Sequence, residues 1–387
     1  MREVAVIGIG QTPVDEHWNL SLKEIAGMAV LQALEDSGRH QIDALFVGNM
    51  LSGIVSRQEN LGALLADWLG LMDIEAQKVE TACSSGAAAV RAAIIAVASG
   101  EVDSAIAVGV EKMTESLPAE TTSALAAASD ADYEASMGLS FVAINALVMQ
   151  RYLSVYKWSH AQFAPFSVNA HTNALTNPHA RLHEKITYES YAKARMIADP
   201  INLLDASPIG DGAAAVVIVP AETARHNKRA IAVVGSASST DTIGVHSRKD
   251  PLWLSAAERS VKSAYSQAKI SPADVDVFEL HDAFSIMTAL SLEACGFAER
   301  GQGPRLGLEG DILLTGRIPI TTFGGLKARG HPVGATGVYQ IVEIIQQLRG
   351  EGGQSQVANA KIGMAQNIGG SGATIITHIF KNSYSTS

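Results

Sequence analysis

The sequence repeats one order of predicted elements, and this repeat constrains the fold more than any other feature. Short β-branched runs ending in glycine occupy residues 4–8 and 231–235, and both are typical of strands. Second strands are predicted at 42–47 and 275–280. Between the strands of each pair lies an amphipathic segment of helical period, opened by a Leu-Ser pair that is a candidate N-cap. The chain is therefore predicted to fold as two related α/β halves.

The repeat divides the chain into an N-terminal half, residues 1–220, and a C-terminal half, residues 221–387. Residues from about 112 to 201 differ in composition from the rest of the chain and are rich in Ala, Ser, His and Tyr. Helical stretches are predicted there at 141–156 and 159–175, with polar and aromatic residues on most faces. We interpret this region as an inserted helical loop domain that packs over the core. A large substrate would bind to this inserted domain.

Composition fits a large α/β enzyme and argues against several other classes of protein. With 387 residues, 47% hydrophobic and 18% charged, the chain can bury a substantial core. Its net charge of −10, without a basic cluster, argues against a nucleic-acid partner. We see no signal peptide and no apolar run of about 18 residues, so we expect no membrane partner and a cytoplasmic location. Cys83 and Cys295 are too few for a disulfide framework or a zinc site.

The third unit of each half carries the residues suited to chemistry. Cys83, in Thr-Ala-Cys-Ser-Ser-Gly at 81–86, opens one helical run, and His331, in the Gly-rich segment 330–337, opens another. Unpaired amides at a helix start carry partial positive charge, which favours thiolate over thiol at Cys83. Both runs are apolar nearly all round and end at a glycine, so we expect them to lie between layers. The repeat would then bring a nucleophile and a base to one pocket.

Each of these residues also has a purely structural interpretation. Cys83 in an Ala-rich segment could be a small buried hydrophobe, His331 could cap a turn, and Asn367 could be a turn residue. Cys295 has no charged or Gly-rich setting and is predicted to lie in the core. The remaining histidines, expected in solvated parts of the insertion, include His160, His171, His179 and His183.

Four ordered blocks resemble the signature blocks of the thiolase superfamily. They are the cysteine block at 81–86, His-Asp-Ala-Phe at 281–284, the Gly-rich block at 324–337, and Asn-Ile-Gly-Gly at 367–370. The resemblance covers nearly the whole chain. It implies a five-layered αβαβα fold with two pseudo-twofold-related halves, and a homodimer or a tetramer built from dimers. It also implies acyl transfer on coenzyme A thioesters, with acetyl-CoA or another acyl-CoA as substrate and no tightly bound cofactor.

By this resemblance, Cys83 would take the acyl group and His331 would activate the thiol. Many thiolases have an Asn at the start of the second block, whereas the His281 form is similar to sterol-carrier-protein-type and archaeal-type thiolases. The amides of Cys83 and Gly369 could form one oxyanion hole, and His281 with His331 the other. No motif identifies the coenzyme A contacts; basic residues that could serve are Arg181, Lys185 and Arg195.

The chain departs from the family at the second cysteine, which shuttles the α-proton in many thiolases. Asn367 occupies one usual position of that cysteine and Ala283 the other. An amide cannot take a proton at neutral pH, so the acid/base work would fall on His281, His331 or a bound water, and Asn367 would shape the oxyanion hole. This combination resembles archaeal-type acetoacetyl-CoA thiolases. These feed hydroxymethylglutaryl-CoA synthase, towards mevalonate and isoprenoids, in a complex with a small OB-fold, zinc-ribbon protein.

The leading prediction is an acetyl-CoA C-acetyltransferase that reversibly joins two acetyl-CoA molecules into acetoacetyl-CoA through acetyl-Cys83. One alternative is a thiolase-fold enzyme with another acceptor, or one that cleaves a sterol side-chain CoA ester. Another is a weakly active scaffold subunit of a multi-enzyme acyl-transfer complex. A ketoacyl synthase acting on a carrier protein is also conceivable, although the acidic net charge suits an acidic carrier poorly. The sequence leaves acyl-chain length and direction open.

Overall fold

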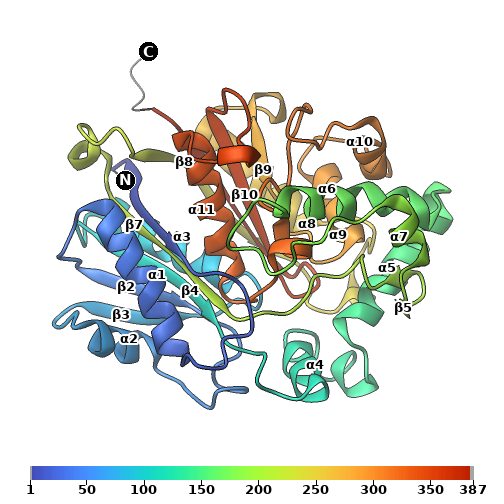
Figure 1. The fold of residues 1–387 in the computed structure, drawn as a ribbon, viewed down its shortest axis with the longest axis horizontal. Coiled ribbons are helices and arrows are strands. Elements are labelled where there is room, and N and C mark those ends of the chain that lie inside the picture. Colours follow the sequence, from blue (N-terminus) through green and yellow to red (C-terminus); the bar gives the residue numbers. More distant parts are fainter. Residues whose placement is uncertain (1, 384–387) are drawn as a thin grey trace.

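The computed structural model describes residues 2–383 and contains a nine-stranded mixed sheet (Figure 1). The halves are joined where β1 pairs antiparallel with β8, over residues 4–6 and 231–233. On either side of this junction the strands follow a mirrored order, as the repeat predicts. The order is β3 (Glu75–Val79), β2 (Ala44–Gly48), β4 (Ala105–Glu111), β7 (Gly212–Pro220), β1 (Val4–Gln11), β8 (Ile231–Thr240), β11 (Thr374–Lys381), β10 (Ile362–Gly369) and β9 (Val277–Glu279).

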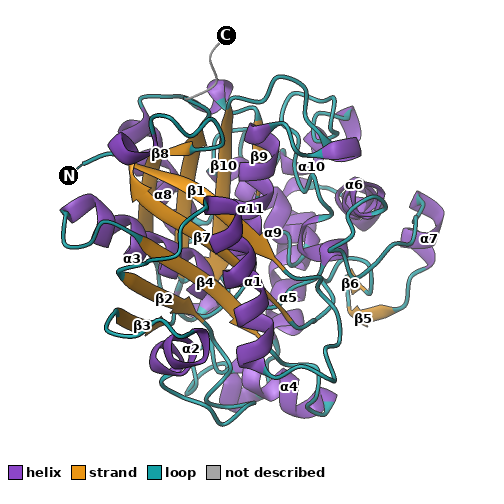
Figure 2. Cartoon of the chain, turned by 60° about the vertical axis from the view of Figure 1, so that its left-hand side comes forward, coloured by secondary structure: helices purple, strands orange, loops and turns teal. Residues whose placement is uncertain are grey.

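Helices α3 (Ser85–Ser99) and α11 (Thr336–Arg349) lie between the two halves of the sheet (Figure 1). Helix α1 (Leu22–Ser37) covers the outer face of the N-terminal half, in front of β4 and β7 in Figure 2. Helix α8 (Ser255–Ala268) covers the outer face of the C-terminal half. The predicted five-layered αβαβα arrangement is therefore confirmed.

The inner strands of the N-terminal half, β2, β4, β7 and β1, are largely buried on both faces because helices cover both faces, whereas the edge strand β3 is polar and partly exposed. Along β7, Val216 and Ile218 pack in the central core with α3 and α11, whereas Val217 and Val219 pack in the outer core with α1. Helix α11 is buried on nearly every side. Burial on all sides is what a position between two layers requires, and the polar side chains of α11 are buried too: Gln340 donates to main-chain carbonyls and Glu343 pairs with Arg329 at 2.7 Å.

The helix ends follow the sequence signals at most, but not all, positions. Ser21 caps α1 with a capping box to Glu24, and the central helices end as predicted at left-handed glycines, Gly100 and Gly350. The predicted cap at 254–255 is wrong, because Ser255 is already the first residue of α8 and Leu254 offers no side-chain bond. The central helices also begin later than expected, after a turn that follows the cysteine or histidine.

The inserted region (green in Figure 1) packs helices over the C-terminal half. The stretch predicted at 141–156 is helix α5 (Phe141–Tyr156). The stretch predicted at 159–175 is a 3₁₀ turn, His160–Phe163, followed by α6 (Ala164–Ala174). Of the four histidines expected in solvent, only His183 is exposed, because His171 is buried and His160 and His179 are half-buried. His171 is buried with its ring at 3.1 Å from the Glu184 carbonyl, and the half-buried His160 lies 2.6 Å from a carboxylate oxygen of Asp205.

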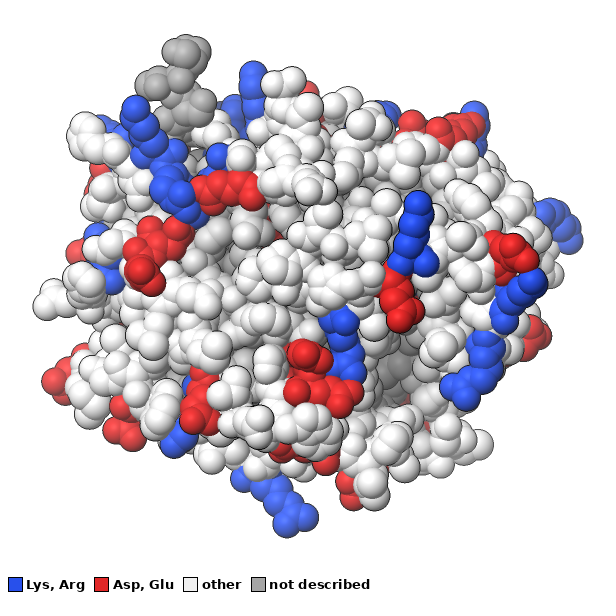
Figure 3. Space-filling view, in the orientation of Figure 1, with Lys and Arg blue, Asp and Glu red and all other residues white. Residues whose placement is uncertain are grey.

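The expectation that no apolar run reaches membrane-spanning length is wrong. The segment Ala82–Ser99 is long and apolar enough to pass a test of length and composition, with a mean hydropathy of 1.5. In this structure 61% of it is buried inside the protein, as the core helix α3. On the molecular face in Figure 3, basic and acidic side chains are interspersed rather than gathered into a basic stripe.

The central layer generates a stability prediction. Ile341→Ala on α11, where the side chain is fully buried, should lower the free energy of unfolding by about 2–5 kcal/mol, because it leaves a cavity between two sheet halves. Urea denaturation followed by circular dichroism measures this loss. The matched control is Ile95→Ala on α3, where the side chain is 42% exposed. Equal losses in the two variants would contradict the assignment of α11 to a tightly packed layer.

Candidate active site

The starts of α3 and α11 converge on one cavity of about 230 Å³. Cys83 reaches it from the turn before α3, His331 from the turn before α11, and His281 from the end of β9. All three side chains are nearly buried, with exposed fractions of 8%, 8% and 4%. Apolar side chains form much of the remaining wall, among them Leu125, Phe141, Val142, Met287 and Val333.

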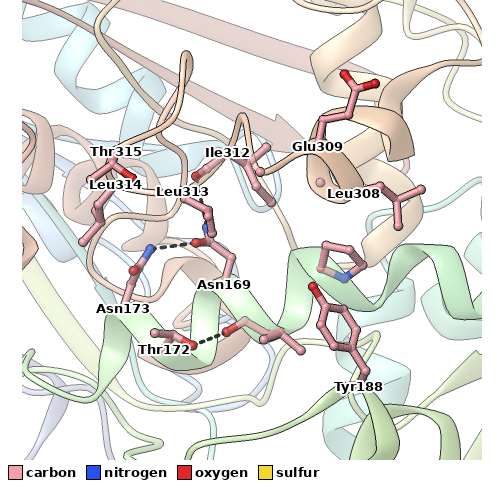
Figure 4. A pocket seen from close by; sticks show the side chains of 14 residues that line it. Asn169, Thr172, Asn173, Tyr188, Leu308, Glu309, Ile312, Leu313, Leu314 and Thr315 are labelled. Carbon is pink, nitrogen blue, oxygen red and sulfur yellow. Dashed lines mark hydrogen bonds between the residues drawn. The ribbon is translucent and has the colours of Figure 1, made fainter.

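A second hollow, of about 450 Å³, lies beside α6 and α10 (Gly303–Glu309), as Figure 4 shows. Its polar side chains already serve the fold, because Asn169 donates to the Ile320 carbonyl at 3.1 Å and Asn173 to the Thr321 carbonyl at 3.0 Å. None of the predicted site residues lines it. The chemistry therefore belongs to the smaller cavity.

Cys83 has a sulfur that is hydrogen-bonded but resting as a thiol. Burial raises its pKa to about 12, and the nearby Glu111 carboxylate adds to the rise, while the N–H groups of Gly370 and Cys83 oppose it. The expected stabilisation of thiolate does not prevail, because burial outweighs the two amide hydrogen bonds to the sulfur. The second amide on the sulfur belongs to Gly370, and Gly369 ends β10 opposite Thr374. The oxyanion hole predicted at the Cys83 and Gly369 amides concerns the acyl oxygen and stays a prediction.

His331 is held by a hydroxyl that the sequence analysis did not single out. Its Nδ1 lies 2.7 Å from Thr336 Oγ1, and that hydroxyl donates its own hydrogen to the Pro332 carbonyl at 3.0 Å. In this arrangement the hydroxyl accepts from His331, the ring hydrogen is on Nδ1, and Nε2 is free to act as a base. Burial, with His281 and Arg329 nearby, lowers the pKa of His331 well below its usual range. The sequence did contain a signal for Thr336, because this residue lies five positions after His331 in the same Gly-rich block.

His281 packs edge-to-face against His331, with ring centroids 5.1 Å apart. Its Nδ1 lies 3.0 Å from Nδ2 of Asn367, a residue of β10 that is 1% exposed. Burial, helped by the Arg329 charge, lowers the pKa of His281 to about 3, so the ring is neutral at physiological pH. The structure thus brings together Cys83, His281, His331 and Asn367.

Two buried carboxylates hold the loops that carry these residues. Asp282 accepts the amide of Leu326 at 2.7 Å, which ties the His281 segment to a π-helical turn, Gly325–Arg329, just before His331. Glu111, at the end of β4, accepts the amide of Gly334 at 3.1 Å in the same loop. Asp282 belongs to the His-Asp-Ala-Phe block, but its role was not predicted, and Glu111 did not stand out, because a carboxylate that accepts backbone amides has no distinctive spacing.

The basic residues considered for coenzyme A lie away from the cavity wall. Arg181 pairs with Glu16 at 2.5 Å, and Lys185 and Arg195 are exposed. None of them lines the cavity around Cys83. Their contact with the coenzyme stays a prediction.

Comparison with known proteins places this geometry in a family. Residues 4–222 match the model described as "Thiolase, N-terminal domain", and residues 237–382 match "Thiolase C-terminal domain-like". The chain is 45% identical to "Acetyl-CoA acetyltransferase" of Methanothermobacter thermautotrophicus, over 98% of this chain and 100% of that protein. It is 38% identical to the protein of the same name from Methanocaldococcus jannaschii, over 99% and 100%. A solved structure titled "Ltp2-ChsH2(DUF35) aldolase" shares the fold, with a TM-score of 0.85 and 22% identity over 98% of this chain and 97% of that one.

The raised pKa of Cys83 generates a pH prediction. In the free protein, the rate at which iodoacetamide alkylates Cys83 should keep rising from about pH 7 to about pH 10, because thiolate is the attacking form and the thiol pKa is about 12. Peptide mapping at each pH measures the rate, and Cys83→Ser reports the background from the buried Cys295. A plateau at or below pH 8 would contradict a resting thiol.

Proposed function

The chain belongs to the thiolase family, and we propose that it acts as an acetyl-CoA acetyltransferase through an acetyl-Cys83 intermediate. The observation that carries the proposal is the meeting of Cys83, His331 and His281 around one small, largely apolar cavity. A cavity of about 230 Å³ suits the small reacting end of an acetyl thioester. The reaction converts two acetyl-CoA molecules into acetoacetyl-CoA and free coenzyme A.

The first step is acylation of Cys83. His331 Nε2 takes the thiol proton as sulfur attacks the acetyl carbonyl, and the coenzyme A thiolate leaves with that proton. Proton transfer accompanies attack, because the resting thiol has a raised pKa and the histidine a lowered one. The amides of Cys83 and Gly369 are the proposed donors to the acetyl oxygen, while the Gly370 amide bonds the sulfur. Loss of one such donor costs roughly 3 kcal/mol.

The second step joins the two acetyl units. A base removes an α-proton from the second acetyl-CoA, and the enolate carbon attacks the carbonyl of acetyl-Cys83. A carbon–carbon bond forms, the bond from sulfur to the acetyl carbon breaks, and the thiolate of Cys83 recovers a proton. Asn367 and Ala283 stand at the family's positions for a second cysteine, so the base comes from the histidine pair.

We propose a cellular setting on the same premise. The reaction takes place in the cytosol, where a reducing compartment keeps the Cys83 thiol free. The protein forms a homodimer or a tetramer of dimers. It works with a small OB-fold, zinc-ribbon protein and hydroxymethylglutaryl-CoA synthase in the route to mevalonate, since removal of acetoacetyl-CoA draws the condensation forward. The His281 and Asn367 pattern, which is similar to archaeal-type thiolases, supports this setting. The solved Ltp2-ChsH2(DUF35) aldolase, which shares the fold and whose name joins two components, supports a partner protein.

Acetyl-CoA alone should acetylate Cys83. Intact mass should rise by one acetyl group, peptide mapping should place that group on Cys83, and Cys83→Ser should abolish it. His331→Ala should slow the labelling, because the thiol loses its base. A label on Cys295 instead, or no label on the folded protein, would contradict the role of Cys83.

The isolated chain should catalyse thiolysis of acetoacetyl-CoA without a partner. The histidine pair can move the α-proton, so the missing second cysteine should not abolish turnover. Loss of the acetoacetyl-CoA absorbance on addition of coenzyme A measures this activity between about pH 6 and 9, the range in which free histidine and thiol titrate. If the isolated chain showed no thiolysis, and thiolysis appeared only after an OB-fold partner was added, the scaffold-subunit hypothesis would replace the hypothesis of a self-sufficient enzyme.

A further inference from the structure

The two histidines of the cavity are held through Nδ1 by partners of opposite hydrogen-bonding character. Starting from the proposed function, we infer that Asn367 is a positioning residue that keeps His281 in the Nε2–H form. His281 is then a fixed neutral donor, and His331 alone carries protons through both steps. With His281 as the donor and His331 as the proton carrier, the reaction needs no second cysteine.

His331 faces an acceptor. Thr336 has a single hydroxyl hydrogen, and it is donated to the Pro332 carbonyl at 3.0 Å. With the hydroxyl hydrogen on that carbonyl, the contact of 2.7 Å between His331 Nδ1 and Thr336 Oγ1 places the other hydrogen on the ring nitrogen, and this is the arrangement we infer. Nε2 of His331 carries a lone pair, and within residues 2–383 it has no hydrogen-bond partner, so it is available to substrate.

His281 faces a donor. Asn367 turns its NH₂ group to Nδ1 of His281 at 3.0 Å, and a neutral ring that accepts at Nδ1 must carry its hydrogen on Nε2. Asn367 lies on the central β10 ladder, paired with Ile376, and its Oδ1 faces the start of α11 at Gly337. That oxygen is buried without a hydrogen-bond partner among the described residues, so the bond to His281 is the one that orients the amide. The partner that sets the tautomer is buried and does not titrate.

These two forms give a balanced reaction with one proton carrier. In acylation, the Cys83 proton passes to His331 Nε2 and leaves on the coenzyme A thiolate. In condensation, the α-proton passes to the same nitrogen while His281 Nε2–H donates to the enolate oxygen. When the new carbon–carbon bond displaces the Cys83 thiolate, His331 returns that proton to it. The enzyme ends in its starting state, and no second acid or base is consumed.

The test compares two substitutions of similar size with the wild-type protein. Asn367→Asp supplies only acceptor oxygens, so it should draw the hydrogen of His281 onto Nδ1 and remove the donor from Nε2. Thiolysis of acetoacetyl-CoA should then fall by about 10²-fold or more, the loss typical of an oxyanion donor. Acetylation of Cys83 by acetyl-CoA should fall much less. Asn367→Leu, which leaves the tautomer free, should lie between Asn367→Asp and the wild type.

Nitrogen-15 NMR of histidine-labelled protein reads the tautomer directly, with His281→Gln used to assign the signals. The inference expects Nε2–H at His281 and Nδ1–H at His331 in the wild type, and this measurement stands even if a variant folds poorly. Nδ1–H at His281, full thiolysis by Asn367→Asp, or equal loss of acetylation and thiolysis in folded Asn367→Asp would overturn it. A wild type that neither acetylates Cys83 nor cleaves acetoacetyl-CoA would instead overturn the proposed function.

Discussion

The close approach of α3 and α11 is the contact on which the site depends. A side chain on Gly86 would lie 2.7 Å from the Gly334 carbonyl, and one on Gly337 would lie 2.5 Å from the Ala87 amide. Glycine at these crossing points lets the backbones of the two helices approach closely between the sheet halves. Because each helix follows a catalytic turn, this approach also fixes the distance between the nucleophile and its base.

The resting cavity is neutral, and this follows from its burial. Removing Cys83, His281 and His331 from water disfavours their charged forms, so the thiol pKa rises and the histidine pKa values fall. A preformed thiolate–imidazolium pair is therefore not the resting state. The same low-dielectric surroundings strengthen each hydrogen bond to charge that develops during reaction, so neutral, well-placed donors suffice. Buried carboxylates such as Asp282 and Glu111 act at a distance, by holding the loops through backbone amides.

The sequence predicted what depends on periodicity and missed what depends on loop geometry. The repeat located both central helices, their glycine ends and their meeting point, because strand and helix periods determine which segments are buried. It missed the Thr336 hydroxyl on His331 and the Gly370 amide on the Cys83 sulfur, since these depend on where a turn directs one hydroxyl or one amide. It also misjudged the thiol pKa, because burial and the Glu111 charge arise from residues distant in sequence.

The nucleophile and the histidines come from opposite halves of the chain. Within residues 2–383 the two parts of the sheet pair directly only along β1 and β8, and the other contacts between the halves include side-chain packing between α3 and α11. The cavity therefore lies on a seam within one polypeptide. A shift of about 1 Å between reacting groups can cost about 10²-fold in rate. A small displacement of one half relative to the other would thus abolish activity while every strand and helix stayed folded. A partner protein that binds both halves at once would stabilise the active arrangement of the catalytic residues.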